Sequence, residues 1–428
     1  MRNIWLTLAV FFAPTAYGLT EYLISAASDL SHIAVELHND SGTRLASTSI
    51  DYALIRDAEA CDGARLSKRA LAAASCARYR VSLRGGGSGR FRVDLPEDVR
   101  VINPARFLFL GEDVRIRLRE GAQISHPWPE LGDNIYTIPR SPRSSEAVLV
   151  IGGFHAIPID GLSKPVAFVG DGRYVDKIRN WLSPVVQIVS FANRFPNPEV
   201  QIIALSVGAR GESPVPFGHV IRNQGETVRF FVDPTRSIEN LHHDWTASHE
   251  LAHLKLPYLS GSGRWLSEGF ASYYQNVLQA RLGYYTEEEA WRRLRRSFSR
   301  AAPVGEDMSP TEATRTEFWK SRLMIYWSGA AFALLADVEL RRLGTTLDAT
   351  LARLETPQRR SWRPDELMAE LDAASETSIF SELYLQHAHT DGMPPTKGLF
   401  DRLGVRQSGG FDESALLAPL RRQIMTAQ

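Results

Sequence analysis

The sequence has little of what marks a fibrous, membrane-embedded or nucleic-acid-binding protein. Its 49 Lys and Arg balance 49 Asp and Glu, so no net charge attracts nucleic acid or anionic lipid. Beyond the N-terminus, no apolar run reaches the roughly 20 residues that span a membrane. With 44% hydrophobic and 23% charged residues, the composition excludes disordered, collagen-like and coiled-coil proteins. We expect a globular protein with no stable membrane span, no nucleic-acid partner and a local recognition site; the oligomeric state stays open.

The N-terminus has the pattern of an export signal. Arg2 precedes the apolar run Ile4–Ala13, which is about half of the roughly 20 residues that cross a bilayer. The small-residue stretch Ala16-Tyr17-Gly18 follows, as before a cleavage site. We therefore expect residues 1–18 to be a signal peptide and the mature protein to be periplasmic or extracellular. A retained N-terminal anchor is the alternative.

The chain has only two cysteines, Cys61 and Cys76. No CxxC pair or flanking histidine accompanies them, so neither looks catalytic or zinc-binding. An oxidising compartment would allow them to form a disulfide, which contributes about 3 kcal/mol at this spacing. Two buried thiols are the alternative.

The hydrophobic pattern changes from strand to helix along the chain. Alternating segments at 33–37, 91–95 and 114–118, with the glycine run 85–89 as a turn, predict a mainly β domain over 19–145. The polar, proline-bearing stretch 139–145 marks its end. Strands are then expected at 147–152, 200–207 and 228–232, with helices at 174–193, 245–256, 265–282, 287–300 and 317–342. We therefore predict an α+β protein with a mixed region over 146–300 and a helical C-terminal region over 301–428.

The segment His249-Glu250-Leu251-Ala252-His253 carries the clearest chemical signal. On a helix of 3.6 residues per turn, both imidazoles lie on one face, one turn apart, and can bind one Zn²⁺. In a chain with 11 His, such a pattern arises by chance roughly once in fifty sequences. Further residues of a metal site are therefore needed before the two histidines can be interpreted as zinc ligands.

A catalytic zinc site needs a third protein ligand and an open position for water. The next expected helix supplies Glu268, within Trp265-Leu266-Ser267-Glu268-Gly269. Glu268 lies off the apolar stripe of this helix, which is formed by Leu266, Phe270, Tyr273 and Val277. A solvated glutamate without a metal is the alternative. A third histidine six positions after the second, as in metzincins, is excluded because Leu259 stands there.

HELAH followed by WLSEGFASYY resembles the gluzincin metallopeptidases, in particular the aminopeptidase N-like and glycyl aminopeptidase families. The segments 325–330 and 334–341 resemble the glycyl aminopeptidase helix that carries an oxyanion-stabilising tyrosine. Residues 394–404 resemble the stretch that closes that family's peptidase unit. The resemblance covers about residues 145 to 405. No PDZ-sized segment follows, so we expect no PDZ domain.

The resemblance implies a thermolysin-like catalytic region between an N-terminal β-sandwich-like domain and the C-terminal helical region. It implies one zinc ion held by His249, His253 and Glu268, with Glu250 as general base and Tyr326 facing the developing oxyanion. The chemistry agrees, because zinc lowers the pKa of its water toward ~7 and a nearby carboxylate can take the proton. For Tyr326, a half-buried helix tyrosine without a catalytic role is the alternative.

Three features differ from the resembling families. The connection between His253 and Glu268 is shorter than in the aminopeptidase N-like pattern, and Ser328 replaces the lysine of the tyrosine motif. The segment Gly218–Asn223 lacks the glutamate that binds a free α-amino group in aminopeptidases. We therefore expect N-acetylated peptides to be cleaved at least as well as free-amine peptides. Whether the protein acts as an endopeptidase or as an aminopeptidase stays open.

The sequence as a whole predicts an exported zinc metallopeptidase that hydrolyses peptides or proteins. One alternative is an inactive, peptidase-like exported protein that binds peptides or envelope proteins. An intact Glu250 argues against it, because a binding module needs no base at that position. A zinc hydrolase that acts on a non-peptide amide or an epoxide is a further alternative.

Overall fold

The computed structural model describes residues 19–46, 49–83, 95–110, 114–138, 147–190, 194–208, 211–222, 225–259, 261–354 and 361–426. The expected signal peptide at 1–18, the glycine run 85–89 and the expected boundary stretch 139–145 lie outside these residues, as does nearly all of the expected strand 91–95.

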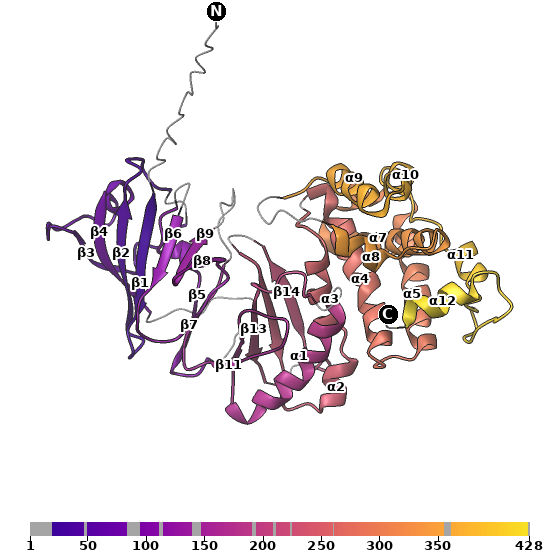
Figure 1. Ribbon diagram of the computed structural model, residues 1–428, viewed down its shortest axis with the longest axis horizontal. Coiled ribbons are helices and arrows are strands. Elements are labelled where there is room, and N and C mark those ends of the chain that lie inside the picture. The colour runs from indigo at the N-terminus through magenta and orange to yellow at the C-terminus, as the bar shows by residue number, and fades with distance from the viewer. Residues whose placement is uncertain are drawn as a thin grey trace, which may run out of the picture.

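The N-terminal part is a sandwich of two sheets (Figure 1). The larger sheet has the strand order β3-β4-β2-β1-β6-β9-β8. Its strands are β1 (Thr20–Ala26), β2 (His32–Asn39), β3 (Ile55–Ala60), β4 (Cys76–Ser82), β6 (Val114–Leu118), β8 (Glu130–Gly132) and β9 (Ile135–Ile138). In β1 and β2, buried and half-buried residues alternate, so one face packs on the core and the other faces outward. The smaller sheet consists of β5 (Val99–Ile102), β10 (Leu149–Gly152) and β7 (Ile124–Ser125).

β10 joins the sandwich to the rest of the protein. Leu149 and Ile151 lie in the core of the sandwich, whereas Val148 and Val150 pack with residues of a third sheet. Burial on both faces explains why this segment reads as a continuous apolar run rather than an alternating one. β10 follows the expected boundary at 145, yet it pairs with the earlier strands β5 and β7. The division into 19–145, 146–300 and 301–428 stays a prediction.

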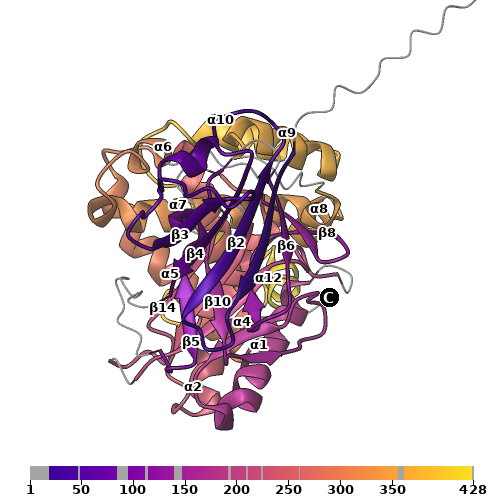
Figure 2. The same cartoon turned by 90° about the vertical axis from the view of Figure 1, so that its left-hand side faces the viewer.

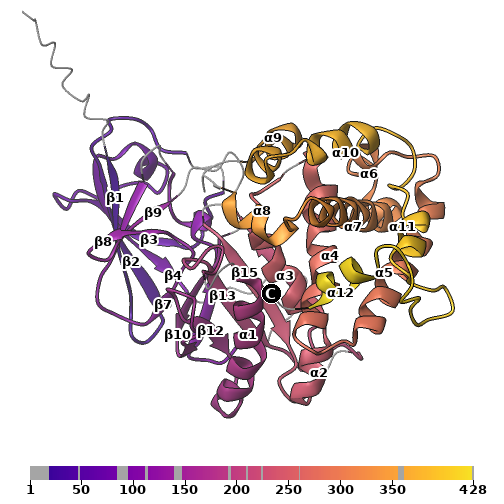
Figure 3. The same cartoon turned by 45° about the vertical axis from the view of Figure 1, so that its right-hand side comes forward.

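The third sheet has the order β11-β12-β13-β15-β14. Its strands are β11 (His155–Ile157), β12 (Val166–Val169), β13 (Gln201–Ser206), β14 (Phe217–Ile221) and β15 (Thr227–Val232). β12, β13 and β15 are parallel, and β14 is an antiparallel edge strand. One face packs on the small sheet, and the other packs on α1 (Val175–Val189), α2 (Ile238–His243) and α3 (Thr246–Ala252) (Figure 3).

The remainder of the chain is helical, which confirms the predicted α+β class with a helical C-terminal region. The α-helices are α4 (Arg264–Arg281), α5 (Glu287–Ala301), α6 (Pro310–Ala313), α7 (Phe318–Arg342), α8 (Leu347–Arg353), α9 (Pro364–Ser375), α10 (Ile379–His387), α11 (Lys397–Arg402) and α12 (Ala418–Met425). Short 3₁₀ helices occur at Ala70–Ala73, Pro104–Arg106, Gly172–Tyr174, His253–Lys255, Gly261–Gly263 and Ala302–Gly305. The expected helices 265–282, 287–300 and 317–342 correspond to α4, α5 and α7.

α7 is long and apolar enough to cross a membrane by length and composition alone. In the folded protein, however, 72% of its apolar window is buried. It contacts α4, α5, α6, α8 and α10, so its apolar residues form the centre of the helical core. We therefore describe α7 as a core helix.

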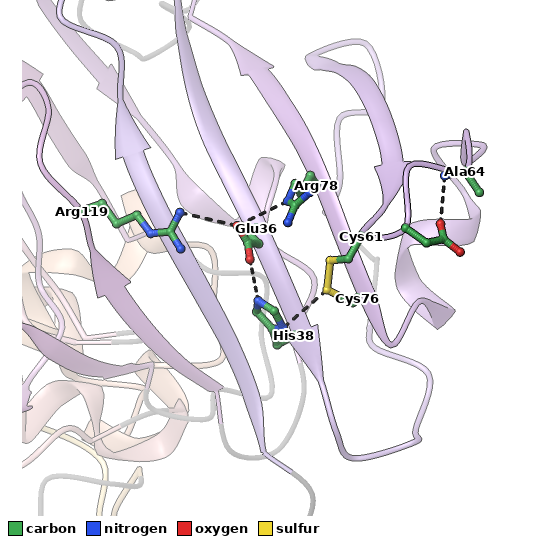
Figure 4. The surroundings of a disulfide bond; sticks show 8 residues. Glu36, His38, Cys61, Ala64, Cys76, Arg78 and Arg119 are labelled. Carbon is green, nitrogen blue, oxygen red and sulfur yellow. Dashed lines mark hydrogen bonds and ion pairs between the residues drawn. A yellow bond between two sulfur atoms is a disulfide. The ribbon is translucent and has the colours of Figure 1, made fainter.

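Cys61 and Cys76 form a disulfide that joins the end of β3 to β4, and their Cα atoms are 5.5 Å apart. The bond lies beside a cluster of charged groups on the outer face of the large sheet, where Cys76 Sγ is 3.5 Å from His38 Nδ1. The strands of this sheet lie nearest the viewer in Figure 2. In this cluster Glu36 lies 2.8 Å from the Nε2 atom of His38 and 3.5 Å from both Arg78 and Arg119 (Figure 4). The expected disulfide is therefore present in the fold.

A buried histidine lies in the N-terminal part. His126 is 7% exposed, and its ring centroid lies 5.3 Å from that of Trp128 and 4.2 Å from that of Tyr136. Its Nδ1 atom has no hydrogen-bond partner among the described residues. Burial, together with the charge of Lys164, lowers the pKa of His126 to about 3. The folded protein therefore strongly favours the neutral imidazole.

This burial predicts a loss of stability in mild acid. Because the folded pKa lies below the unfolded value of about 6.5, the full contribution is present above pH ~6.5 and declines as the pH falls toward 3. Between pH 6.5 and 4.5 the loss should be about 2 to 3 kcal/mol. We expect His126→Phe, which keeps a ring in the stack, to remove this part of the pH dependence. Urea unfolding at pH 7 and pH 4.5 measures the free energy of unfolding, with the exposed His243→Phe as the control. An equal loss of stability between these pH values in wild type and His126→Phe would contradict the prediction.

Candidate active site

The first four residues of HELAH end α3, and His253 begins the 3₁₀ turn His253–Lys255, so the α-helix expected over 245–256 ends at Ala252. α3 packs against the edge strand β14. Gly218 of β14 lies so close that a Cβ atom there would be 2.7 Å from Thr246 Cγ2 and 2.8 Å from Glu250 Cγ. At the start of the helix, Asp244 Oδ1 accepts a hydrogen bond of 2.9 Å from the Thr246 amide. Gln279 of α4 donates to the carbonyl oxygen of Asp244 at 2.8 Å. The strand expected upstream of the zinc helix thus lies directly beside Glu250.

The end of the helix is held by Arg222, which follows β14 and whose side chain is only 6% exposed. Its guanidinium donates to the Leu256 carbonyl at 2.9 Å and to the His253 carbonyl. Glu226 lies 3.4 Å from the same guanidinium. The His253 carbonyl also accepts from the Leu256 amide at 3.3 Å, and Arg222 adds donors to both carbonyl groups of this turn, which holds the backbone of His253.

α4 brings Glu268 to the two histidines. Glu268 Oε2 lies 3.5 Å from His249 Nε2 and 3.6 Å from His253 Nε2, and one ligand atom of each residue lies within 4.8 Å of the others. Ligands about 2.1 Å from a tetrahedral zinc ion are about 3.4 Å apart, so this spacing fits one metal ion. The structure therefore brings all three predicted ligands together.

The outer nitrogens of both imidazoles have partners of their own. His249 Nδ1 lies 2.9 Å from Gln275 Oε1, and His253 Nδ1 lies 3.4 Å from Ser267 Oγ. A ligating histidine usually donates its other ring N–H to such a partner, which fixes the ring and its tautomer. Both Nε2 atoms are thereby directed toward Glu268, and the donor set has the composition that zinc prefers.

The two carboxylates of the site have opposite electrostatic environments. Burial raises the pKa of Glu268, but hydrogen bonds and charge from His249 and His253 outweigh this and hold it below its usual range. Burial raises the pKa of Glu250 to about 7; the charge of His249 opposes this shift and that of Glu268 adds to it. Glu268 is therefore the anion suited to bind metal, and Glu250 is the group suited to exchange a proton.

A close crossing of α4 and α7 completes the site. A Cβ atom on Gly269 would lie 2.2 Å from Gly329 Cα, and one on Gly329 would lie 2.0 Å from the Trp265 carbonyl oxygen. Gly269 is next to Glu268 in sequence, and Gly329 is one turn after Tyr326. The Tyr326 ring is stacked on that of His249, with centroids 5.9 Å apart and planes inclined by 14°.

The phenol of Tyr326 is held in its neutral form. Burial raises its pKa, and the negative charges of Glu268 and Glu250 raise it further. Ser328, which occupies the position of the lysine in the resembling motif, is fully buried and donates to the Met324 carbonyl at 2.6 Å. Of the motif's two polar positions, only Tyr326 therefore faces the site.

Sequence reasoning missed several residues that shape the site. Gln275, Ser267 and Arg222 orient the histidines, and Arg264 lies 3.9 Å from Glu268 Oε1. Only Arg264 had a local signal, because it precedes Glu268 by four residues and shares its helix face. The contacts of Arg222 depend on how β14 lies against α3, which no local pattern shows.

The helix crossing predicts a specific sensitivity to small substitutions. Gly329→Ala should separate α4 from α7, because the added methyl group would collide with the Trp265 carbonyl. We expect a loss of about 1 to 3 kcal/mol of stability and weaker zinc binding. Denaturant unfolding and a competitive zinc titration measure the two effects.

Gly398→Ala in α11 is the matched control, because a Cβ atom there meets nothing within 4 Å. It should leave both stability and zinc affinity at the wild-type level. Equal behaviour of the two alanine variants would show that the crossing tolerates a methyl group and that our account of it is wrong.

Comparison with known proteins adds a family match over part of the chain. Residues 259–330 match the family described as M61 glycyl aminopeptidase. The matched segment contains Glu268 and Tyr326 and begins after both histidines. No curated protein sequence matches the chain.

Among solved structures, the chain is similar to a two-domain M1 zinc metallopeptidase bound to L-arginine, with 13% identity over 88% of this chain and 94% of that one and a TM-score of 0.46. It is also similar to an M1 zinc metallopeptidase from Deinococcus radiodurans bound to a Tyr-Ser-Ala substrate, with 13% identity, coverage of 88% and 94%, and a TM-score of 0.45. The M61 match and the His-His-Glu group confirm the predicted resemblance and support a zinc metallopeptidase with a single metal site.

Proposed function

We propose that this protein hydrolyses peptide bonds, with one zinc ion held by His249, His253 and Glu268. The observation that carries the proposal is the placement of Glu268 Oε2 at 3.5 and 3.6 Å from the two Nε2 atoms, next to a buried Glu250. When bound, zinc polarises the scissile carbonyl and lowers the pKa of the attacking water. All other steps depend on the residues of the chain.

Glu250 is the proposed general base. Its pKa of about 7 allows it to accept a proton from the attacking water near neutral pH and to return that proton to the leaving amine. Gly218 carries no side chain, so β14 can lie directly beside this carboxyl group. A larger residue at Gly218 would displace Glu250 or Thr246.

Tyr326 is the proposed oxyanion donor. Its O–H group stays protonated at neutral pH because burial and two carboxylates raise its pKa. A neutral phenol can donate a hydrogen bond to the oxygen that becomes negative during attack. The stacked His249 ring holds the phenol near the metal ligands.

The edge of the central sheet supports a peptide as the substrate. β14 is the last strand of the described sheet, and it runs beside the helix that carries Glu250. An extended peptide could add to this edge through main-chain hydrogen bonds, as in other β-augmentation complexes. This mode of binding requires neither a free N-terminus nor a particular side chain.

Export is a further part of the proposal. The disulfide between Cys61 and Cys76 favours an oxidising compartment, which is consistent with a signal peptide over 1–18. Periplasm and external medium both meet this condition.

The Glu250→Gln substitution tests the base. It removes the proton acceptor but leaves all three ligands, so we expect hydrolysis to be abolished while zinc stays at one per chain. Turnover of a fluorogenic peptide mixture and metal analysis of the purified protein provide the two measurements. The exposed Glu306→Gln is the matched control and should retain wild-type turnover.

Near wild-type turnover of Glu250→Gln would show that the mechanism is wrong. If zinc-loaded wild type cleaves no peptide but binds peptides, the protein is the inactive binding module considered above.

The Tyr326→Phe substitution tests the oxyanion donor. Because a group that acts mainly in the transition state changes kcat rather than substrate binding, we expect kcat to fall by about 10²-fold with little change in KM. The ring stack on His249 should persist, so zinc content should be unchanged. Steady-state kinetics on one peptide measure the effect, and unchanged kcat would return Tyr326 to a packing role.

A further inference from the structure

A positively charged, partly exposed side chain lies beside the proposed site. Arg264 is the first residue of α4, and its side chain is 44% exposed. Its guanidinium carbon lies 4.5 Å from the centre of the Phe318 ring at the start of α7. Phe318 in turn lies 6.3 Å from the ring of Tyr326. Arg264 thus bridges the two helices that carry Glu268 and Tyr326.

Arg264 donates no hydrogen bond within the part of the chain that the structure describes, and its ion pair with Glu268 is long. Its Nε atom lies 3.9 Å from Glu268 Oε1, which is too far for a hydrogen bond. A zinc ion held by Glu268 would further weaken the attraction between this carboxylate and Arg264. A guanidinium group whose flat face is held by an aromatic ring keeps its N–H edge free for a carboxylate.

A second arginine lies on the same side of α7. Phe318, Arg322 and Tyr326 are spaced four residues apart and therefore share one face of the helix. Arg322 is exposed, and no described carboxylate pairs with it. Lys320, by contrast, faces away from this stripe and pairs with Glu317 at 3.1 Å.

The charged groups near the phenol indicate which substrate charge the site favours. Of the charged side chains that the structure places next to Glu268 and Phe318, Arg264 carries a positive charge and is partly exposed. β14, on the other side of Glu250, contributes no acidic side chain. Glu268 is paired with His249 and His253, and a bound zinc ion would add positive charge beside Arg264, which favours a substrate carboxylate over an ammonium group at this position.

We propose that Arg264, assisted by Arg322, binds a carboxylate of the substrate next to the scissile bond. The proposal rests on the proposed peptidase function and specifies its substrate class. The carboxylate comes either from an acidic side chain or from a free C-terminus, and both offer two oxygens to a guanidinium edge. Such substrates are preferred over neutral peptides of the same length.

The test uses the zinc-loaded full-length protein and two pairs of matched peptides. One pair differs only by Glu against Gln in the residue that follows the cleavage site, and the other differs by a free C-terminus against an amide. For at least one pair, we expect wild type to show kcat/KM about tenfold higher for the charged member, mainly through KM. The pair that shows the preference identifies the source of the carboxylate.

Three variants test which side chain causes the preference for charged peptides. Arg264→Gln should reduce the charged-to-neutral ratio to about 1 to 2, and Arg322→Gln should reduce it less, because Arg322 lacks the stacked position. Lys320→Gln is the matched control and should leave both the ratio and the activity unchanged. Raising the salt concentration from about 0.05 M to about 0.5 M should lower the wild-type ratio.

Two results would overturn the proposal. One is a charged-to-neutral ratio that is the same in wild type and Arg264→Gln, whether near 1 or above it. The other is a loss of zinc from Arg264→Gln with an equal fall for every peptide, because Arg264 would then serve only to support Glu268.

A binding measurement separates this proposal from the proposed function. If wild type hydrolyses none of the peptides, the peptidase function fails, and the same pairs are titrated into zinc-loaded Glu250→Gln by fluorescence polarisation. About tenfold tighter binding of a charged member, lost when Arg264→Gln is added, supports carboxylate recognition. Equal binding of both members of each pair overturns it.

Discussion

The contact between two glycines, Gly269 of α4 and Gly329 of α7, is the constraint on which the candidate site depends. Because neither residue has a side chain, the helix backbones approach more closely than most side chains would allow. Glu268 and Tyr326 lie within one turn of this contact on their respective helices. Both side chains therefore reach His249 from adjacent directions.

The position of α3, which carries His249 and Glu250, must also be fixed for the site to form. α3 has only seven residues, so its position depends on tertiary contacts more than on its own hydrogen bonds. Gly218 fixes the helix at its centre, Gln279 at its start and Arg222 at its end. Two of these contacts come from β14 and its continuation, so the edge strand positions the helix that carries His249 and Glu250.

Charge in the site is divided among groups that differ in burial. Glu268 and Glu250 are both largely buried, but only Glu268 has two imidazoles as partners. One carboxylate is therefore held as an anion, and the pKa of the other is raised toward neutrality. The partly exposed Arg264 adds a positive charge on the solvent side of the same cluster. The two carboxylates differ because of their surroundings and not because of their residue type, since both are glutamates.

The local pattern of the sequence carried much of the prediction. The spacing of His249 and His253 requires that both lie on one helix face, and the apolar stripe beginning at Leu266 predicts which face of α4 is buried. The alternation in β2 and β6 predicted strands for the same reason. Each of these inferences depends on residues that are close in sequence, where helix and strand geometry relate spacing directly to direction.

Contacts between distant segments were decided by tertiary structure alone. β10 follows the expected boundary, but the burial of its two faces places it in one sheet with β5 and β7. Arg222 lies 31 residues before His253, and nothing in the local sequence indicates that it satisfies the His253 carbonyl. By itself, the sequence determined which residue types can bind the metal and that His249 and His253 share one helix face. It could do so because helix geometry relates residues four positions apart. The convergence of both histidines with Glu268, Tyr326 and Arg264 was decided by the packing of α3, α4 and α7, which depends on the shapes of all three helices together.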